Sequence, residues 1–138
     1  MAYDPNNIFA KIARGEAPAF KVYEDDHTIA FMDIMPQADG HTLVVPKEAA
    51  VNLFDLSEQG AQAAIVATQR VARAVRAAFA PDGLSIGQFN GAAAGQTVFH
   101  YHMHLIPRNL GASLAIHSRV PGDPARLAEI AKQLSEAL

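Results

Sequence analysis

The sequence predicts an α+β fold, with a five-stranded, mostly antiparallel sheet, one long helix and one or two shorter helices. Two observations lead to this prediction. Short apolar segments bounded by Gly, Pro, Asn and Asp recur along the chain, which is typical of strands joined by turns. The stretch 58–79 instead repeats its apolar positions every three or four residues, as a helix does. This helix stands before the last two strands, which is the arrangement of an α+β domain.

The five expected strands lie at residues 20–24, 28–33, 41–45, 84–89 and 97–106. The pair Asp25-Asp26 forms a turn between the first two, so these strands should make a hairpin. Because side chains alternate across a strand, Phe31 and Asp33 should share one face, as should His41 and Leu43.

Three segments have helical features. Asp4 and Pro5 have the pattern of an N-cap followed by proline, and they should open a short helix that ends near Gly15. Ser57 should cap the long helix 58–79, and the last helix should start at Asp123-Pro124. The expected buried positions are Ile65, Thr68, Ala72, Val75 and Phe79 in the long helix, and Leu127, Ile130, Leu134 and Leu138 in the last one.

Composition excludes several classes of function. The chain has 138 residues, 50% of them hydrophobic and 18% charged, which suits one folded domain over residues 1–138. Without cysteine, a disulfide scaffold or a thiolate metal site is excluded. A net charge of −3 argues against nucleic-acid binding. The polar N-terminus is unlike a signal peptide and no apolar run is long enough for a membrane helix, so we expect a cytoplasmic protein with no membrane partner.

The most informative segment is 100–104, in which every second residue is a histidine. On a strand, His100, His102 and His104 would share one face, while Tyr101 and Met103 would point to the core. Half of the six histidines are therefore used in one row. An ordinary core or surface strand has no need of such a row.

Two chemistries use a row of this kind. Histidines two residues apart can bind zinc, with His104, His41 or a carboxylate as the third ligand. Alternatively, a neutral imidazole can attack phosphorus and form a covalent intermediate that water then releases. Most of an imidazole is already neutral near pH 7, and burial beside other imidazoles increases that fraction. The second chemistry therefore suits this row.

The preceding loop, 90–97, favours the phosphorus chemistry. Its small residues let a ligand approach the backbone, and Gly95 can offer N–H groups to an anion. Asn90, Gln96 and Thr97 add neutral hydrogen-bonding groups. The loop contains no carboxylate, so it is a poor source of metal ligands. His27 and His117 look like turn or loop residues, and no role is predicted for them.

The segment His100–Ile106 resembles the signature of the histidine triad (HIT) family, in which apolar residues separate and follow three histidines. The resemblance extends from Ile8 through Arg108 and is strongest with the Hint-like and bacterial branch. It includes Ala30–Ile34, Pro36-Gln37, His41–Lys47, Asn90 and Gly95–Thr97. This combination is more specific than the three histidines alone. It implies a single HIT domain with its core at 8–108, followed by a C-terminal tail and helix at 109–138.

The resemblance implies a nucleotide hydrolase or transferase that acts at the α-phosphorus of nucleoside 5′-phosphoramidates, which are AMP or GMP conjugates. His102 would attack phosphorus and carry the nucleotidyl group. His104 and His100 would line the phosphate and leaving-group side, with His41 packed near His100. Asp33 would bind the ribose hydroxyls. The phosphate or leaving group would contact Asn90, Gly95, Gln96 and Thr97, and the walls of the base site would be Ile8, Phe9, Ile12, Phe31, Ile34 and Leu43.

The same resemblance implies a homodimer with joined sheets and packed long helices, a purine nucleotide as substrate, and no cofactor. Some bacterial relatives carry cysteines near the Ile8-Phe9 segment and bind a structural zinc through them and two histidines, and relatives often have a histidine after the lysine. Here Asn7, Ala10 and Ala49 stand at the corresponding positions, so no metal is expected.

Three alternatives stay open. The tail after Arg108 does not match the Hint branch, so the leaving group is either an amine or the second nucleotide of a dinucleoside polyphosphate such as diadenosine tri- or tetraphosphate. A nucleotide-binding regulatory protein with incidental hydrolysis is the second alternative. A metalloprotein with histidine ligands is the third.

Overall fold

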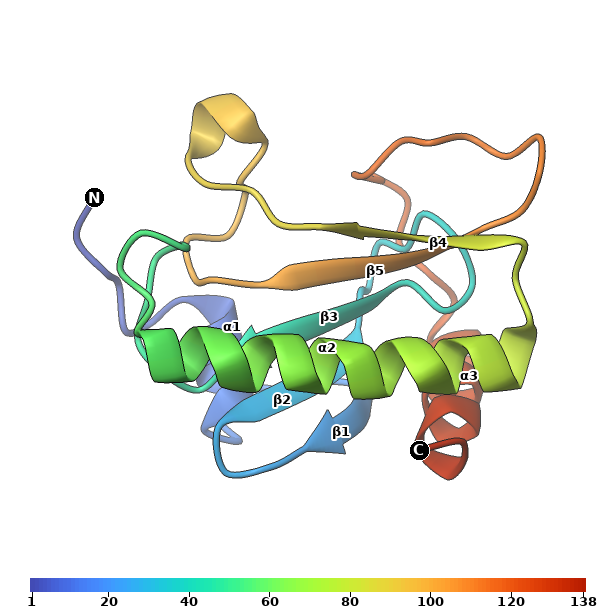
Figure 1. Cartoon of the computed structure of the whole chain (residues 1–138), viewed down its shortest axis with the longest axis horizontal. Helices are drawn as coiled ribbons and strands as arrows, with labels where there is room; N and C mark the ends of the chain where they lie inside the picture. The colour runs from blue at the N-terminus through green and yellow to red at the C-terminus, as the bar shows by residue number, and fades with distance from the viewer.

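Five strands form one antiparallel sheet, and helices cover parts of both of its faces (Figure 1). The computed structural model describes residues 1–138. Its elements are α1 (Ile8–Ala13), β1 (Lys21–Glu24), β2 (Thr28–Met32), β3 (Thr42–Pro46), α2 (Glu58–Phe79), β4 (Gly83–Gly87), a 3-10 turn (Ala92–Ala94), β5 (Met103–Arg108) and α3 (Pro124–Glu136). The strand order is β1-β2-β3-β5-β4. The predicted α+β class is confirmed.

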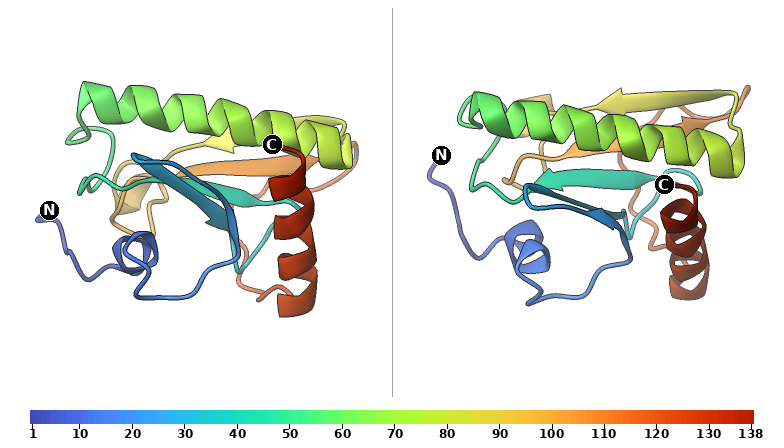
Figure 2. Two further views of the ribbon diagram at one scale, coloured as in Figure 1. Left: turned by 90° about the horizontal axis from the view of Figure 1, so that it is seen from below. Right: turned by 60° about the horizontal axis from the view of Figure 1, so that its bottom comes forward.

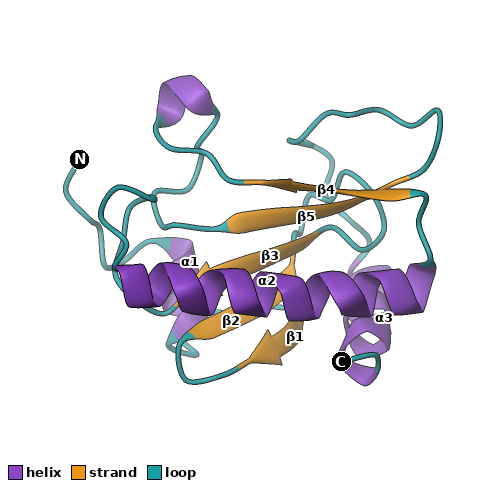
Figure 3. Ribbon diagram, viewed as in Figure 1, coloured by secondary structure: helices purple, strands orange, loops and turns teal.

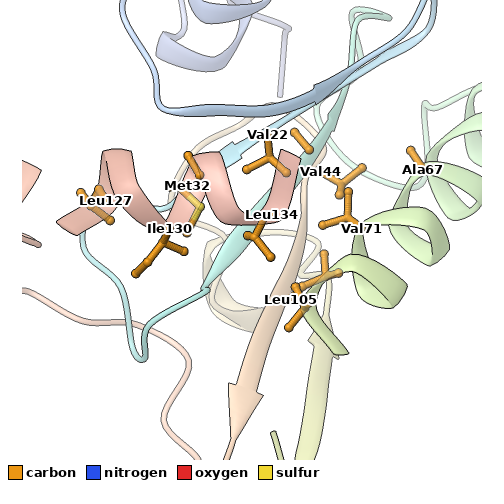
Figure 4. Close-up of a cluster of buried hydrophobic side chains, with 12 residues drawn as sticks. Val22, Met32, Val44, Ala67, Val71, Leu105, Leu127, Ile130 and Leu134 are labelled. Atoms are coloured by element: carbon orange, nitrogen blue, oxygen red, sulfur yellow. The ribbon is translucent and has the colours of Figure 1, made fainter. Parts of the chain in front are cut away.

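The two faces of the sheet carry separate apolar clusters. Val22, Met32, Val44 and Leu105 point toward α2 and α3, and they form the larger cluster with residues of those helices (Figure 4). The opposite face carries Phe9, Ile29, Phe31, Leu43 and Val45, so it is covered by α1. Figure 2 shows α1 and α2 on opposite sides of the sheet. Because strand side chains alternate, neighbouring residues of β2 and β3 serve different clusters.

Three helical predictions need correction. The first helix is capped by Asn7, whose Oδ1 accepts from the Ala10 N–H at 2.9 Å, whereas Asp4 accepts from the Asn6 N–H in the turn before it. The long helix begins after Ser57, as predicted. Ile65 is exposed instead of buried, because the helix turns small alanine side chains toward the sheet, which lets the helix pack close to the sheet. The last helix starts as predicted, and it ends at Glu136, so Leu138 is also exposed.

The strand predicted for 97–106 starts only at Met103. Its earlier part leaves the ladder because other groups use its backbone. The His100 carbonyl accepts from the His102 ring at 2.7 Å, and the Tyr101 N–H donates to the Ala50 carbonyl at 2.9 Å. A carbonyl satisfied by a side chain needs no strand partner. The other strand ends differ from the predictions by at most two residues.

Long connections without helix or strand flank the 3-10 turn and join β5 to α3 (Figure 3). None of the helices combines the length and the apolar character that crossing a membrane requires.

Candidate active site

A pocket of about 490 Å³ opens between α1 and the sheet face that α1 covers. Its apolar wall contains all six residues predicted for the base site, namely Ile8, Phe9, Ile12, Phe31, Ile34 and Leu43. Its polar lining consists of Asp33, Thr97, His102, His104, His117 and Ser118. No lysine or arginine lines it.

The sheet register builds the floor of this pocket. Phe31 pairs with Leu43, and Leu43 pairs with His104, so the three side chains form a row across neighbouring strands. On the far side His104 pairs with Gly87. A Cβ at Gly87 would lie 3.1 Å from the Phe89 ring, so glycine lets that ring approach, and Phe89 packs 5.7 Å from the His104 ring. An apolar surface therefore leads directly to an imidazole.

His102 is held in one orientation and one tautomer. Its Nδ1–H donates to the His100 carbonyl at 2.7 Å, which leaves the lone pair on Nε2. The Phe9 ring lies edge-on at 4.9 Å. Burial lowers the pKa of His102 to about 4, because the charged imidazolium would lose its hydration. At neutral pH the ring is therefore uncharged and carries an unprotonated Nε2.

A chain of hydrogen bonds fixes the proton of His104. The Gln37 N–H donates to His41 Nδ1 at 3.0 Å, so His41 carries its proton on Nε2. His41 Nε2–H then donates to His104 Nδ1 at 3.0 Å, which leaves the His104 proton on Nε2. Burial lowers the pKa of His41 to about 4 and that of His104 to about 3, so both rings are neutral.

His104 Nε2 is buried and has no hydrogen-bond partner. An unpaired buried donor is costly and is therefore a sign of function. In the lining of this pocket it suits an acceptor brought by a ligand, such as a phosphate oxygen. The expectation that His41 packs near His100 is wrong, because His41, the residue before β3, lies beside His104 instead.

Asp33 lies next to the His41–His104 pair. Its Oδ1 accepts from the Met35 N–H at 2.9 Å, and its Oδ2 lies 3.4 Å from His41 Nε2. Burial raises the pKa of this carboxyl. Asp33, His41 and His104 offer ligand atoms within 4.8 Å of one another, so they could hold a metal ion. Before a metal ion could bind there, the proton between His41 Nε2 and His104 Nδ1 would have to be removed.

His100 does not line the pocket, contrary to prediction. Its Nε2–H donates to the Pro46 carbonyl at 2.8 Å, and its Nδ1 accepts from the Tyr3 hydroxyl at 2.8 Å. The residue is fully buried, and burial lowers its pKa. Because the strand begins after His100, the predicted alternation does not extend to it. His100 acts on the site through its carbonyl, which orients His102.

The loop 90–97 also differs from its predicted role, since only Thr97 and not Asn90, Gly95 or Gln96 lines the pocket. Gln96 accepts from the Gly91 N–H at 2.8 Å and donates to the Val51 carbonyl at 2.6 Å. Asn90 accepts from the Leu53 N–H at 2.9 Å. The Gly95 N–H donates to the Ala92 carbonyl and is not free for an anion. These residues shape the loop and do not contact the pocket.

His117, for which no role was predicted, lies in the pocket. The tail between β5 and α3 brings it there, so that its ring packs 5.7 Å from His104 and 5.9 Å from Phe89. Its Nε2–H donates to the Gly95 carbonyl at 2.8 Å. No local pattern marks this position, because contacts distant in sequence hold the tail.

The site defines a class of protein. A neutral, oriented imidazole with an unprotonated Nε2 lies beside an unpaired N–H donor and an apolar wall, an arrangement that suits a phosphate bonded to a planar apolar group such as a nucleoside base.

Comparison with known proteins shows the family of the chain. The HIT domain family matches residues 14–111, and the chain belongs to the HIT family of nucleotide-binding proteins and nucleotide hydrolases. Bacillus subtilis "Protein hit" is 48% identical over 103 residues, which are 75% of this chain and 71% of that protein. The structure of a HIT-like protein from Bartonella henselae, described as involved in cell-cycle regulation, covers 100% of both chains with 50% identity and a TM-score of 0.93. A zinc-bound histidine triad protein from Mycobacterium smegmatis is 38% identical, with a TM-score of 0.84 and 96% and 92% coverage of this chain and that one.

Proposed function

We propose that the protein hydrolyses purine nucleoside 5′-phosphoramidates, the AMP or GMP conjugates of amines, through a covalent nucleotidyl intermediate on His102. One observation carries this proposal: the His100 carbonyl holds His102 Nδ1–H at 2.7 Å, so that a neutral ring keeps the lone pair on Nε2. A neutral imidazole in this tautomer is a nucleophile that needs no base to activate it.

The neighbouring groups have complementary tasks. His104 Nε2–H would donate to a phosphate oxygen and stabilise the charge that grows there during attack. The Thr97 hydroxyl would add a neutral donor. Asp33 would accept from the ribose hydroxyls, and the purine would pack against the wall formed by residues such as Phe31 and Leu43.

The proposal is tested by incubating the protein with adenosine 5′-phosphoramidate and measuring AMP release and the intact mass after a rapid, acid-free quench. We expect AMP release, a nucleotidyl adduct on the wild-type protein, and neither with His102→Ala. AMP affinity should be similar in both proteins, because the wall and Asp33 remain. Near-full activity of His102→Ala would refute the nucleophile.

The alternatives are separate outcomes of the same assay. Faster cleavage of diadenosine tri- or tetraphosphate than of the phosphoramidate would identify a dinucleoside polyphosphate hydrolase. Tight AMP binding without turnover of either substrate would identify a regulatory nucleotide-binding protein.

We also propose that the protein is a homodimer joined at the free edge of β4. This strand ends the sheet, and Ile86 on it is exposed on the same face as α2, since it pairs with Leu105. Ile65 and Val66 of α2 are exposed as well. Unpaired strand edges with exposed apolar residues are typical of interaction surfaces. Light scattering should give twice the chain mass of 14.7 kDa, and Ile65→Lys should shift it toward the single chain.

A further inference from the structure

The C-terminal tail, residues 109–122, is held across the pocket by contacts near its middle and at its C-terminal end. The Arg108 guanidinium donates to the carbonyls of Ser113 at 2.8 Å and Ala115 at 2.6 Å. At the C-terminal end the Gly122 N–H donates to the Ile34 carbonyl at 2.8 Å. Arg108 is itself only 9% exposed, so a nearly buried cation is used to fix the path of an otherwise irregular segment (Figure 1). Between these anchors lies His117.

His117 is oriented in the same manner as His102. A backbone carbonyl, that of Gly95, accepts from one ring nitrogen, Nε2, at 2.8 Å. The other nitrogen, Nδ1, has no hydrogen-bond partner in the protein. Of the four imidazoles at the site, counting His41 behind His104, His117 alone is exposed. The His117 ring, with Nδ1 free of protein partners, is therefore accessible to water and to the leaving group of a ligand in the pocket, unlike the three buried rings.

The remaining groups of the pocket cannot supply a proton to a departing amine. His102 must be unprotonated on Nε2 to attack. His104 is neutral, and its Nε2–H is far too weak an acid to transfer completely. Asp33 has the task of binding the ribose hydroxyls in the proposed function, which places it away from the leaving group. The hydroxyls of Thr97 and Ser118 are far weaker acids than an imidazolium. No lysine or arginine reaches the lining. An alkylamine is a poor leaving group unless it is protonated as the bond to phosphorus breaks.

We propose that His117 is the leaving-group acid of the reaction, an inference that rests on the proposed function. As His102 Nε2 forms its bond to phosphorus, the phosphorus–nitrogen bond breaks and its electron pair stays with the amine nitrogen. That nitrogen takes the proton from Nδ1 of the His117 imidazolium, which becomes neutral. Water then attacks phosphorus, the bond to His102 breaks, and one water proton returns to His117. The products are the nucleoside monophosphate and the amine.

The test compares two leaving groups on one nucleotide. One substrate is an alkyl phosphoramidate of AMP, which needs a proton at its leaving nitrogen, and the other is the p-nitrophenyl ester of AMP, which departs without one. We expect His117→Ala to lower kcat/KM for the phosphoramidate about 100-fold or more and to change that for the ester by no more than about threefold. Equal losses for both substrates, or no loss for either, would overturn the assignment.

Two further variants separate proton transfer from positioning. The amide of His117→Gln can donate to the Gly95 carbonyl but cannot transfer a proton, so it should be as defective as His117→Ala on the phosphoramidate. Recovery of activity in His117→Gln would reduce His117 to a positioning residue. Leu114→Ala, an exposed substitution in the same tail, should behave as wild type with both substrates. A wild-type protein that releases AMP from neither substrate would instead refute the proposed function.

Discussion

The neutral state of His102 should make the fold sensitive to mild acid. Burial moves its pKa from 6.5 to about 4 in the folded protein. Between these values the unfolded chain binds a proton that the folded one does not, so stability falls as the pH falls through this window. Between about pH 7 and pH 5, His102 alone should cost about 2 kcal/mol of unfolding free energy. That is a large fraction of a typical domain's 5–15 kcal/mol or so.

Urea unfolding followed by circular dichroism at both pH values measures this loss. His102→Gln removes the titrating ring and keeps an amide that can donate to the His100 carbonyl, so it should lose about 2 kcal/mol less than wild type over the same interval. His27→Ala removes an exposed turn histidine and should lose as much as wild type. Equal losses in wild type and His102→Gln would show that the fold does not hold His102 neutral, and the argument for its nucleophilicity would fail.

Three further predictions concern the groups around His102. Asp33→Ala should raise KM about tenfold for ribonucleotide conjugates and much less for deoxyribonucleotide ones, because only the former lose hydroxyl contacts; equal effects in steady-state assays would argue against this role. His41→Ala should lower kcat about tenfold or more, because without the bond from His41 the His104 proton can move from Nε2 to Nδ1. His41→Gln can still donate to His104 Nδ1 and should retain more activity; identical kinetics of the two variants would disprove this role of His41. Dialysis against a chelator should leave AMP release unchanged, and a loss that zinc restores would assign Asp33, His41 and His104 to a metal ion.

Local patterns predicted most of the elements and which strand residues share a face, whereas the remaining residues of the candidate site came from the family resemblance. Alternation placed Phe31 beside Asp33, and the pairing of Leu43 with His104 then joined the apolar wall to the triad. Those relations depend on strand geometry, which the sequence expresses directly.

The errors arose where hydrogen bonds between distant residues decide the structure. His100 leaves the histidine row because its carbonyl serves His102 and its ring bonds to Pro46 and Tyr3. Gln96 has the chemistry of a phosphate ligand, yet it is used to close its own loop against Val51. The spacing of apolar and polar residues along the chain does not reveal hydrogen bonds of this kind. The position of His117 was missed for the same reason, since Arg108 holds the tail through backbone carbonyls that any residue provides.

The most direct test of the central claim is the stereochemical course of hydrolysis at phosphorus. An adenosine 5′-phosphoramidate made chiral with sulfur would be hydrolysed in water enriched in oxygen-18, and the configuration of the product would be determined by phosphorus NMR. Attack by His102 followed by attack of water involves two inversions, so the account predicts overall retention, however short-lived the intermediate is. Inversion would mean that water attacks the substrate directly, and the covalent role of His102 would be contradicted.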